Sequence, residues 1–239
     1  MPPPPPRLEA VPDLVDQAHA ALLRAICDGS LAPGARLTQE DLAERLAVSR
    51  QPVLQALRLL KRDGFVQDAP GRGLAVTPLD PALVRDVYAV RGALDALAAR
   101  LAAERGARLD EGLFTRGRAA AQGGDINAMV EADLDFHHAI YAAAGNPFIG
   151  QTAQPHWQHL RRAMGAVLAH QPQRASIWDE HQAIAQAIAL GDAEQAARLS
   201  EQHARQAGQA LAARLEELLN APAPTPGQPI SHPQGAIAP

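Results

Sequence analysis

Three segments in the first third of the chain place apolar residues at the spacing of an amphipathic helix. They span about residues 13–28, 38–46 and 49–62. Thr38 and Ser49 stand where side chains cap helices, and Pro52 falls in a first turn, where its missing N–H costs no hydrogen bond. The pattern therefore predicts three helices, of which the last two are joined by a tight turn.

Two short apolar runs follow at about residues 65–67 and 74–77, with the turn sequence Pro70-Gly71-Arg72-Gly73 between them. They predict a two-stranded ribbon, and three helices with such a ribbon form a winged helix-turn-helix, which binds DNA. The helix after Ser49 carries no acid and several basic residues, namely Arg50, Arg58, Lys61 and Arg62. An ordinary helical hairpin with a solvated charged face is the alternative that these residues leave open.

The rest of the chain is helical in pattern until about residue 220. Helices are predicted at about 81–104, 110–121, 125–144, from 147 onward, 173–190 and 192–220, and Pro155 predicts a kink in the fourth. The expected fold is mainly α, with a winged helix-turn-helix at 11–78 and an all-α bundle at 79–220. Proline-rich segments at 1–10 and 221–239 are expected to be disordered.

Composition agrees with a helical protein, because 47% of the residues are hydrophobic but only 3% are aromatic. Residues 20–78 hold eight Lys and Arg against six Asp and Glu, whereas residues 79–239 hold thirteen against seventeen. This distribution fits a DNA-binding part joined to an acidic one. The single cysteine excludes an intrachain disulfide framework. Because no signal peptide or long apolar run is visible, we expect a cytoplasmic protein without a membrane span.

Four side chains in the second part could converge on a metal ion. Asp133 and His137 lie four residues apart and so share one helix face. His181 and His203 lie about equally far from the turn at Gly191-Asp192, which places them level in an antiparallel hairpin. Imidazole and carboxylate donors suit zinc, nickel, iron or manganese, and the lack of a thiolate favours a site with open positions. Alternatively, nine scattered histidines produce such spacings by chance.

A more specific signal runs through the first part in unbroken order. It includes Pro33-Gly34, Leu42-Ala43, Val48-Ser49-Arg50, Asp63-Gly64 and Gly71-Arg72-Gly73. This segment of about fifty residues resembles the N-terminal domain of GntR-family transcription regulators. The resemblance implies a winged helix-turn-helix that binds double-stranded DNA.

Motifs in the second part are also specific. They are Val90-Arg91 with Asp95, Asp133-Leu-Asp-Phe136-His137 with Gly145-Asn146-Pro147, and His181, Gly191-Asp192 and His203. They resemble the FCD ligand-binding domain of the FadR-like subfamily. The resemblance implies a divalent metal, zinc being expected first, with the ligands Asp133, His137, His181 and His203. It also implies a small organic acid whose carboxylate reaches the metal and pairs with Arg91, although an interhelical salt bridge is an equal alternative for that arginine.

The two resemblances imply a ligand-responsive regulator, expected to be a repressor and not an enzyme. A homodimer would set two winged helices on a palindromic operator. Arg50 and Gln51 are expected to contact base edges, and Thr38, Ser49 and Arg58 to contact phosphates. The remaining candidates for DNA contact are Gln55, Arg72 and Gly73.

Two residues of the predicted helix after Ser49 depart from the GntR-family pattern. Leu54 and Gln55 stand where many family members have arginine and glutamate, which argues against direct transfer of a family operator. Trp157 and Arg162 lie on the predicted helix that contains Pro155. We expect Trp157 to pack in the core and Arg162 to face solvent, rather than either of them to line a pocket.

Two alternative functions are a metal sensor without an organic effector and a metal-dependent enzyme. No carboxylate stands out as the general base that an enzyme would need.

Overall fold

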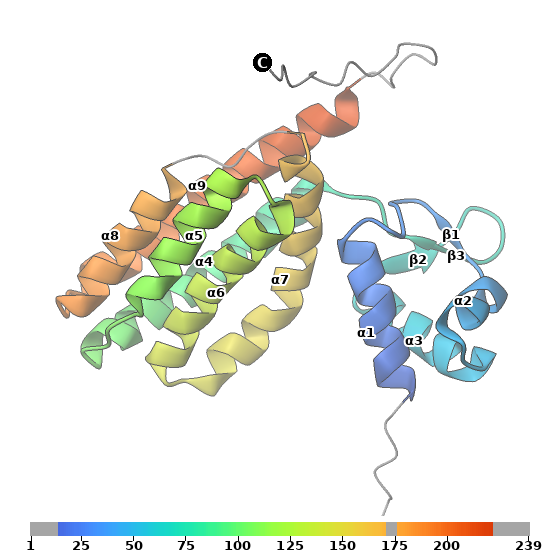
Figure 1. The fold of residues 1–239 in the computed structure, drawn as a ribbon, viewed down its shortest axis with the longest axis horizontal. Helices are drawn as coiled ribbons and strands as arrows, with labels where there is room; N and C mark the ends of the chain where they lie inside the picture. The colour runs from blue at the N-terminus through green and yellow to red at the C-terminus, as the bar shows by residue number, and fades with distance from the viewer. Residues whose placement is uncertain (1–13, 171–175, 222–239) are drawn as a thin grey trace, which may run out of the picture.

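The computed structural model describes residues 14–170 and 176–221, which fold into two parts (Figure 1). The disorder expected at 1–10 and, apart from Ala221, at 221–239 lies outside these residues. The smaller part contains α1 (Leu14–Cys27), β1 (Arg36–Leu37), α2 (Gln39–Leu46), α3 (Arg50–Arg62), β2 (Val66–Asp68) and β3 (Leu74–Val76). The larger part contains α4 (Pro81–Glu104), α5 (Glu111–Gly123), α6 (Ile126–Ala144), α7 (Pro147–Leu168), α8 (Ile177–Ala189) and α9 (Ala193–Asn220).

The helix-turn-helix forms where the apolar pattern predicts it. The Thr38 hydroxyl accepts a hydrogen bond from the Asp41 amide at 3.3 Å and so begins α2. Ala47 ends α2 in the left-handed region, with φ of 53°, and this turns the chain into α3. Ser49 occupies the N-cap position of α3, but its side chain makes no capping hydrogen bond, contrary to the expectation. The apolar face of α3 is buried against α1 and α2.

The wing has three strands where the sequence predicts two. β1 pairs with β3 in antiparallel register, Arg36 opposite Ala75, and the strand order is β1-β3-β2. A strand of two residues carries no periodicity that a sequence pattern can reveal, so β1 is set by its backbone pairing alone. The Arg36 guanidinium also donates to the Pro70 carbonyl at 2.7 Å, which ties β1 to the wing tip.

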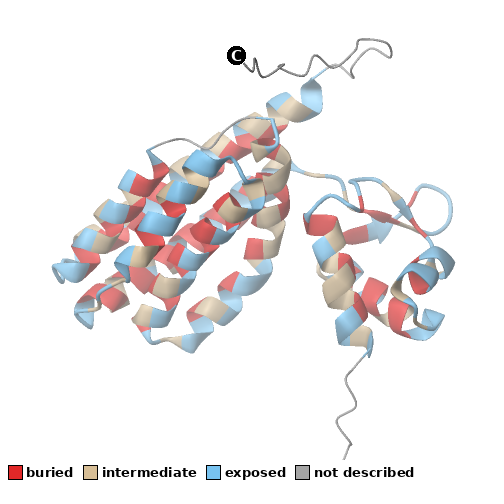
Figure 2. Ribbon diagram, in the orientation of Figure 1, coloured by how far each residue is buried: buried red, intermediate tan, exposed pale blue. Residues whose placement is uncertain are grey.

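The helical bundle begins at Pro81, directly after the Asp80 cap, and α4 packs along α9 over much of its length. Asp125 and Asp192 cap α6 and α9, as their positions in the sequence predict. The mainly α fold is therefore confirmed, and buried residues face the interior of the bundle (Figure 2). In the described part of the chain, no helix is both long and apolar enough to cross a bilayer.

The two parts have separate hydrophobic cores and meet where α1 and α7 lie side by side (Figure 1). His159 on α7 stacks on Phe65 with ring centroids 4.1 Å apart, and its Nε2 lies 3.1 Å from the Asp63 carbonyl oxygen. Arg162, also on α7, donates to the Thr77 carbonyl. Arg162 is only 6% exposed, so the expectation of a solvent position is wrong, because the winged part covers this face of α7.

We predict that Gly117→Ala on α5 destabilises the bundle. A Cβ atom at Gly117 would lie 2.0 Å from the ring of Trp178 on α8, and a buried indole cannot withdraw without opening the core. Overpacking of this kind costs about 1–3 kcal/mol, which lowers the Tm by several degrees. Gly123→Ala is the matched control on the same helix, because its Cβ would meet nothing within 4 Å. Equal thermal unfolding curves for the two variants would contradict the packing described.

Candidate metal and ligand site

Four helices bring polar side chains together in the core of the bundle. Asp133 and His137 come from α6, His181 from α8 and His203 from α9, while Arg91 comes from α4. All five side chains are buried, with 0–3% of their surface exposed. Asp133 and His137 share one face of α6 because they lie four residues apart, and the antiparallel α8–α9 hairpin places His181 beside His203. We call these five residues the polar cluster.

The three histidines of the polar cluster form its tightest group, with one ring nitrogen from each lying within 4.8 Å of the others. The Nε2 atoms of His181 and His203 are 3.3 Å apart. Burial holds the pKa of His137 and of His181 well below the usual range, so both rings are neutral, which is the form that binds a metal. His203 Nδ1 lies 2.9 Å from a Glu180 carboxylate oxygen. That contact favours the tautomer whose Nε2 lone pair faces the other two rings.

Asp133 lies at the edge of this group. Its Oδ1 is 3.5 Å from His181 Nε2 and has no hydrogen-bond partner. Desolvation raises the pKa of the Asp133 carboxyl. His181 Nδ1 is likewise buried without a partner, against the stacked ring of Phe136. Buried polar atoms nearly always have hydrogen-bond partners. Here a carboxylate oxygen and imidazole nitrogens face one another with too few N–H donors between them, and a bound cation would satisfy these atoms.

Arg91 is held by its own helix. Its Nε donates to Asp95, four residues further along α4, at 2.9 Å, and its Nη2 lies 2.9 Å from His137 Nε2. The guanidinium carbon stands 4.2 Å from the ring centre of Trp157. The salt bridge considered as an alternative therefore exists, but it lies within α4 and does not join two helices. Arg91 Nη1 remains buried without a partner, and one donor is thus available to a ligand.

The structure adds three residues that the sequence reading did not assign to the cluster. The Tyr141 hydroxyl donates to Asp95, which accepts from Arg91 through its other oxygen, and Glu180 orients His203. Helical spacing could have indicated two of them, because Asp95 is four residues after Arg91 and Tyr141 four after His137. Nothing in the sequence indicates Glu180. The expected core packing of Trp157 agrees with its 1% exposure, although its ring also covers the cluster.

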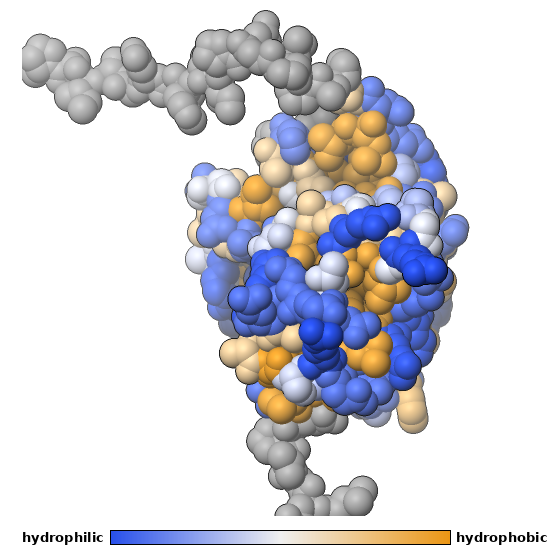
Figure 3. All heavy atoms as spheres, turned by 90° about the vertical axis from the view of Figure 1, so that its right-hand side faces the viewer, coloured by the Kyte–Doolittle hydropathy of each residue, from blue (hydrophilic) through white to orange (hydrophobic). Residues whose placement is uncertain are grey.

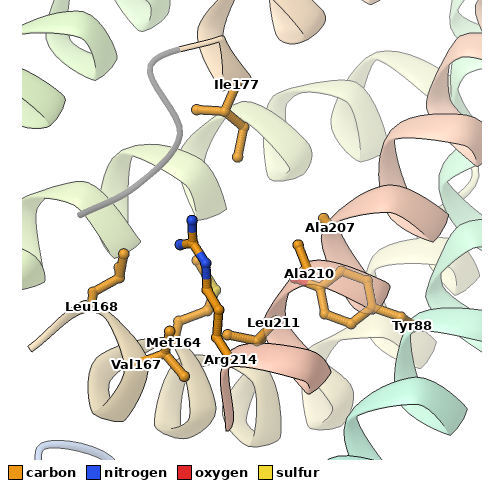
Figure 4. Close-up of a pocket in the computed structure, with 9 residues that line it drawn as sticks. All are labelled: Tyr88, Met164, Val167, Leu168, Ile177, Ala207, Ala210, Leu211 and Arg214. Atoms are coloured by element: carbon orange, nitrogen blue, oxygen red, sulfur yellow. The ribbon is translucent and has the colours of Figure 1, made fainter. Parts of the chain in front are cut away.

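A small apolar pocket of about 60 Å³ lies between α7 and α9 (Figure 4). Met164, Leu168 and Leu211 form its wall, and the Arg214 side chain extends into the space. Tyr88 lines the pocket and also lies 4.9 Å from the Arg91 guanidinium carbon, so one ring separates this space from the polar cluster.

The candidate DNA-contacting residues lie on the surface of the winged part. Most of that surface is hydrophilic and surrounds a smaller apolar area (Figure 3). Arg50 is exposed and pairs with Glu40 on α2 at 2.9 Å. Gln55 is half-buried, and the other candidates are exposed, namely Thr38, Ser49, Gln51, Arg58, Arg72 and Gly73. The oxygen of Thr38 is used as a helix cap, and Gly71 and Gly73 form the wing tip with φ of 91° and 99°.

A winged helix-turn-helix followed by a helical bundle is the architecture of a DNA-binding transcription regulator. Comparison with known families gives the particular class. Residues 14–76 match the family of bacterial regulatory proteins named gntR, and residues 86–206 match the FCD domain. The chain belongs to the GntR family and carries an FCD domain.

Relatives in sequence are named as regulators of transcription. An HTH-type regulator in an unstable DNA locus of Streptomyces ambofaciens is 34% identical over 167 residues, which cover 68% of this chain and 70% of that one. The repressor RspR of Escherichia coli is 31% identical over 52% of this chain and 56% of its own length. McbR/YncC of E. coli has the same fold, with a TM-score of 0.70 and 21% identity over 88% of this chain and 100% of that one.

Proposed function

We propose that this regulator is a ligand-responsive repressor whose bundle binds a divalent metal and a small organic acid. The observation that carries the proposal is the polar cluster, in which three buried imidazoles and an unsatisfied carboxylate oxygen face one another in a closed core. Two relatives support repression by their names, RspR and a probable repressor of D-xylose utilization from Paenarthrobacter nicotinovorans, the latter 27% identical over 76% of this chain and 81% of that one.

In this proposal the metal ligands are His137, His181, His203 and Asp133. Nitrogen and oxygen donors without a thiolate suit zinc first, and nickel, iron or manganese as well. Glu180 holds the ring of His203 from outside, as the partners of metal-bound histidines commonly do. Binding through His137 Nε2 would replace its present contact with Arg91. The metal would supply a Lewis-acidic centre with positions open to a ligand.

Arg91 is the residue that we propose for the organic acid. Its Nη1 is an unsatisfied buried donor, and release of its Nη2 from His137 on metal binding would leave two donors in the planar fork that pairs with a carboxylate. The aromatic ring of Trp157 at 4.2 Å and the ion pair with Asp95 keep the guanidinium in this orientation. A carboxylate is therefore the chemical group that the cluster is best suited to receive.

Dimer formation would complete the regulator, and α4 offers a surface for it. Leu83, Val90 and Leu97 recur at seven-residue intervals and are exposed by 38%, 48% and 42%. Residues seven apart lie on one face of a helix, so these three form a continuous apolar stripe. A second copy that packs the same stripe against this one makes a two-fold interface, and two winged helices would then meet a palindromic operator.

We predict that Arg50→Ala removes specific DNA binding, whereas Leu54→Ala retains most of it. Arg50 lies at the exposed start of α3, where recognition helices contact base edges, and its surface pair with Glu40 is too weak to withhold it from DNA. Loss of one arginine contact to a base lowers affinity by about tenfold or more. Operator fragments selected by the wild-type protein provide the measurement, and equal losses in both variants would contradict the assignment.

We predict that Asp133→Ala and His181→Ala each lower the metal content of the purified protein. His138→Ala is the matched control, because His138 follows His137 but is exposed. Metal content is measured by elemental analysis after loading with zinc and removal of the excess by dialysis. Retention of one metal per chain in both variants would exclude the cluster as the metal site.

The function itself is tested by titration of metal and then of carboxylic acids into the protein bound to its operator. Release from DNA by an acid that is recovered unchanged supports the proposal, and the release should be lost in Arg91→Gln. If metal alone changes the affinity for DNA and acids have no effect, the protein is a metal sensor. Chemical conversion of the acid would instead indicate a metal-dependent enzyme.

We predict that Val90→Glu converts a dimer to a monomer. A charge in the centre of the α4 stripe would be buried without a partner in the paired state, which costs several kcal/mol per copy. Leu190→Glu is the control, since Leu190 is 76% exposed but lies at the end of α8, away from the stripe. Analytical ultracentrifugation gives the molecular mass, and an unchanged dimer in Val90→Glu would exclude this surface.

A further inference from the structure

A cavity of about 510 Å³ lies between the winged part and the bundle. Its walls come from the end of α1, from α7, from the start of α6 and from the end of α9. None of its lining residues belongs to the polar cluster. The volume is in the range that accommodates a small molecule, so this space is a second candidate for a ligand.

Arg162 is the residue that points to the chemistry of that ligand. Its side chain lines the cavity and is only 6% exposed, and its Nη2 donates to the Thr77 carbonyl. Arg162 Nε is buried without a partner. Within residues 14–170 and 176–221, no carboxylate lies within ion-pair distance of this guanidinium.

Comparison with Arg91 shows how unusual this arrangement is. Arg91 is even more deeply buried, but its charge is balanced by Asp95 at 2.9 Å. A buried charge without a counter-ion is costly, and the usual resolution is an ion pair or a bound ion of opposite charge. Burial lowers the pKa of the Arg162 guanidinium, because desolvation disfavours its charged form.

The other residues that line the cavity determine the size and polarity of the ligand that fits it. Ile126, Val130 and Leu218 supply an aliphatic wall. Asp28 also lines the cavity and would repel a second negative charge on the ligand. Arg161 also lines the cavity, but it is only half-buried and pairs with Glu131, which leaves Arg162 as the buried cation of the lining. These features fit one acidic group attached to a short aliphatic body.

We propose that this interdomain cavity binds an aliphatic monocarboxylate through the guanidinium of Arg162. The carboxylate accepts hydrogen bonds from Arg162, and the hydrocarbon chain packs against the wall formed by Ile126, Val130 and Leu218. The site needs no metal and is separate from the proposed effector site in the polar cluster. Because both parts of the protein contribute walls, a ligand there stabilises the present arrangement of the winged part on α7.

The test is calorimetric titration of the full-length, EDTA-treated protein with hexanoate, with its neutral analogue hexanamide and with acetate. We expect hexanoate to bind. Hexanamide and acetate should bind at least about tenfold more weakly, because hexanamide lacks the charge and acetate lacks the hydrocarbon chain. The metal is absent throughout, so failure of the polar cluster as a metal site would not affect the result. Absence of hexanoate binding, or equal binding of hexanamide, would overturn the proposal.

Variants locate the bound hexanoate. Arg162→Gln should weaken its binding by about tenfold or more, while Arg118→Gln serves as the matched control, because Arg118 is a partly exposed arginine that pairs with Asp179 on α8. Ala169→Trp fills the cavity from an exposed lining position and tests the site without altering Arg162. Thermal unfolding of each variant establishes that it is folded. Unchanged hexanoate affinity in either Arg162→Gln or Ala169→Trp would place the ligand elsewhere and overturn the proposal.

Discussion

The ion pair between Arg91 and Asp95 stands in the centre of the bundle, and the other buried polar groups depend on it. Both side chains are almost fully buried, so neither charge is stabilised by water and each requires the other. Asp95 also accepts from the Tyr141 hydroxyl, and Arg91 reaches the ring of His137. A change at any member of this network alters the hydrogen bonds of its neighbours. The core of this domain is therefore held in one arrangement by directional contacts as well as by apolar packing.

Close helix packing brings these groups within reach of one another. A Cβ atom on Gly208 of α9 would meet the Tyr88 side chain of α4 at 2.7 Å, and one on Gly92 would meet Ala204 at 3.3 Å. Glycines at these positions allow α4 and α9 to approach closely, which places Arg91 beside the histidines. Four helices contribute to the polar cluster, and a ligand that pulls on it would act on all four. The cluster is thus a point at which a small chemical event can alter the shape of the domain.

Local patterns explain most of the helices, whereas the environment of single side chains depends on contacts that no local pattern contains. Apolar spacing and the caps at Asp80, Asp125 and Asp192 predicted the helices closely, because both signals act within a few residues. The convergence of His181 and His203 followed from the geometry of a helical hairpin. Strand β1 was missed because it exists only through pairing with β3. The burial of Arg162 was not predicted because the winged part covers it, through contacts such as that with Thr77, which is distant in the sequence.

The position of α7 explains how the two parts of the protein can communicate. Trp157 faces the bundle, where its ring lies against Arg91 and His137. His159 follows by two residues and so points about 200° away around the helix, toward Phe65 of the winged part. One helix therefore contacts the polar cluster on one face and the DNA-binding part on the other.

A rotation of α7 that accommodates a change around Trp157 must also move the His159 ring against Phe65, because the two side chains share one rigid backbone. Pro155 lies just before them and removes one backbone hydrogen bond, which makes this part of α7 the easiest to deform.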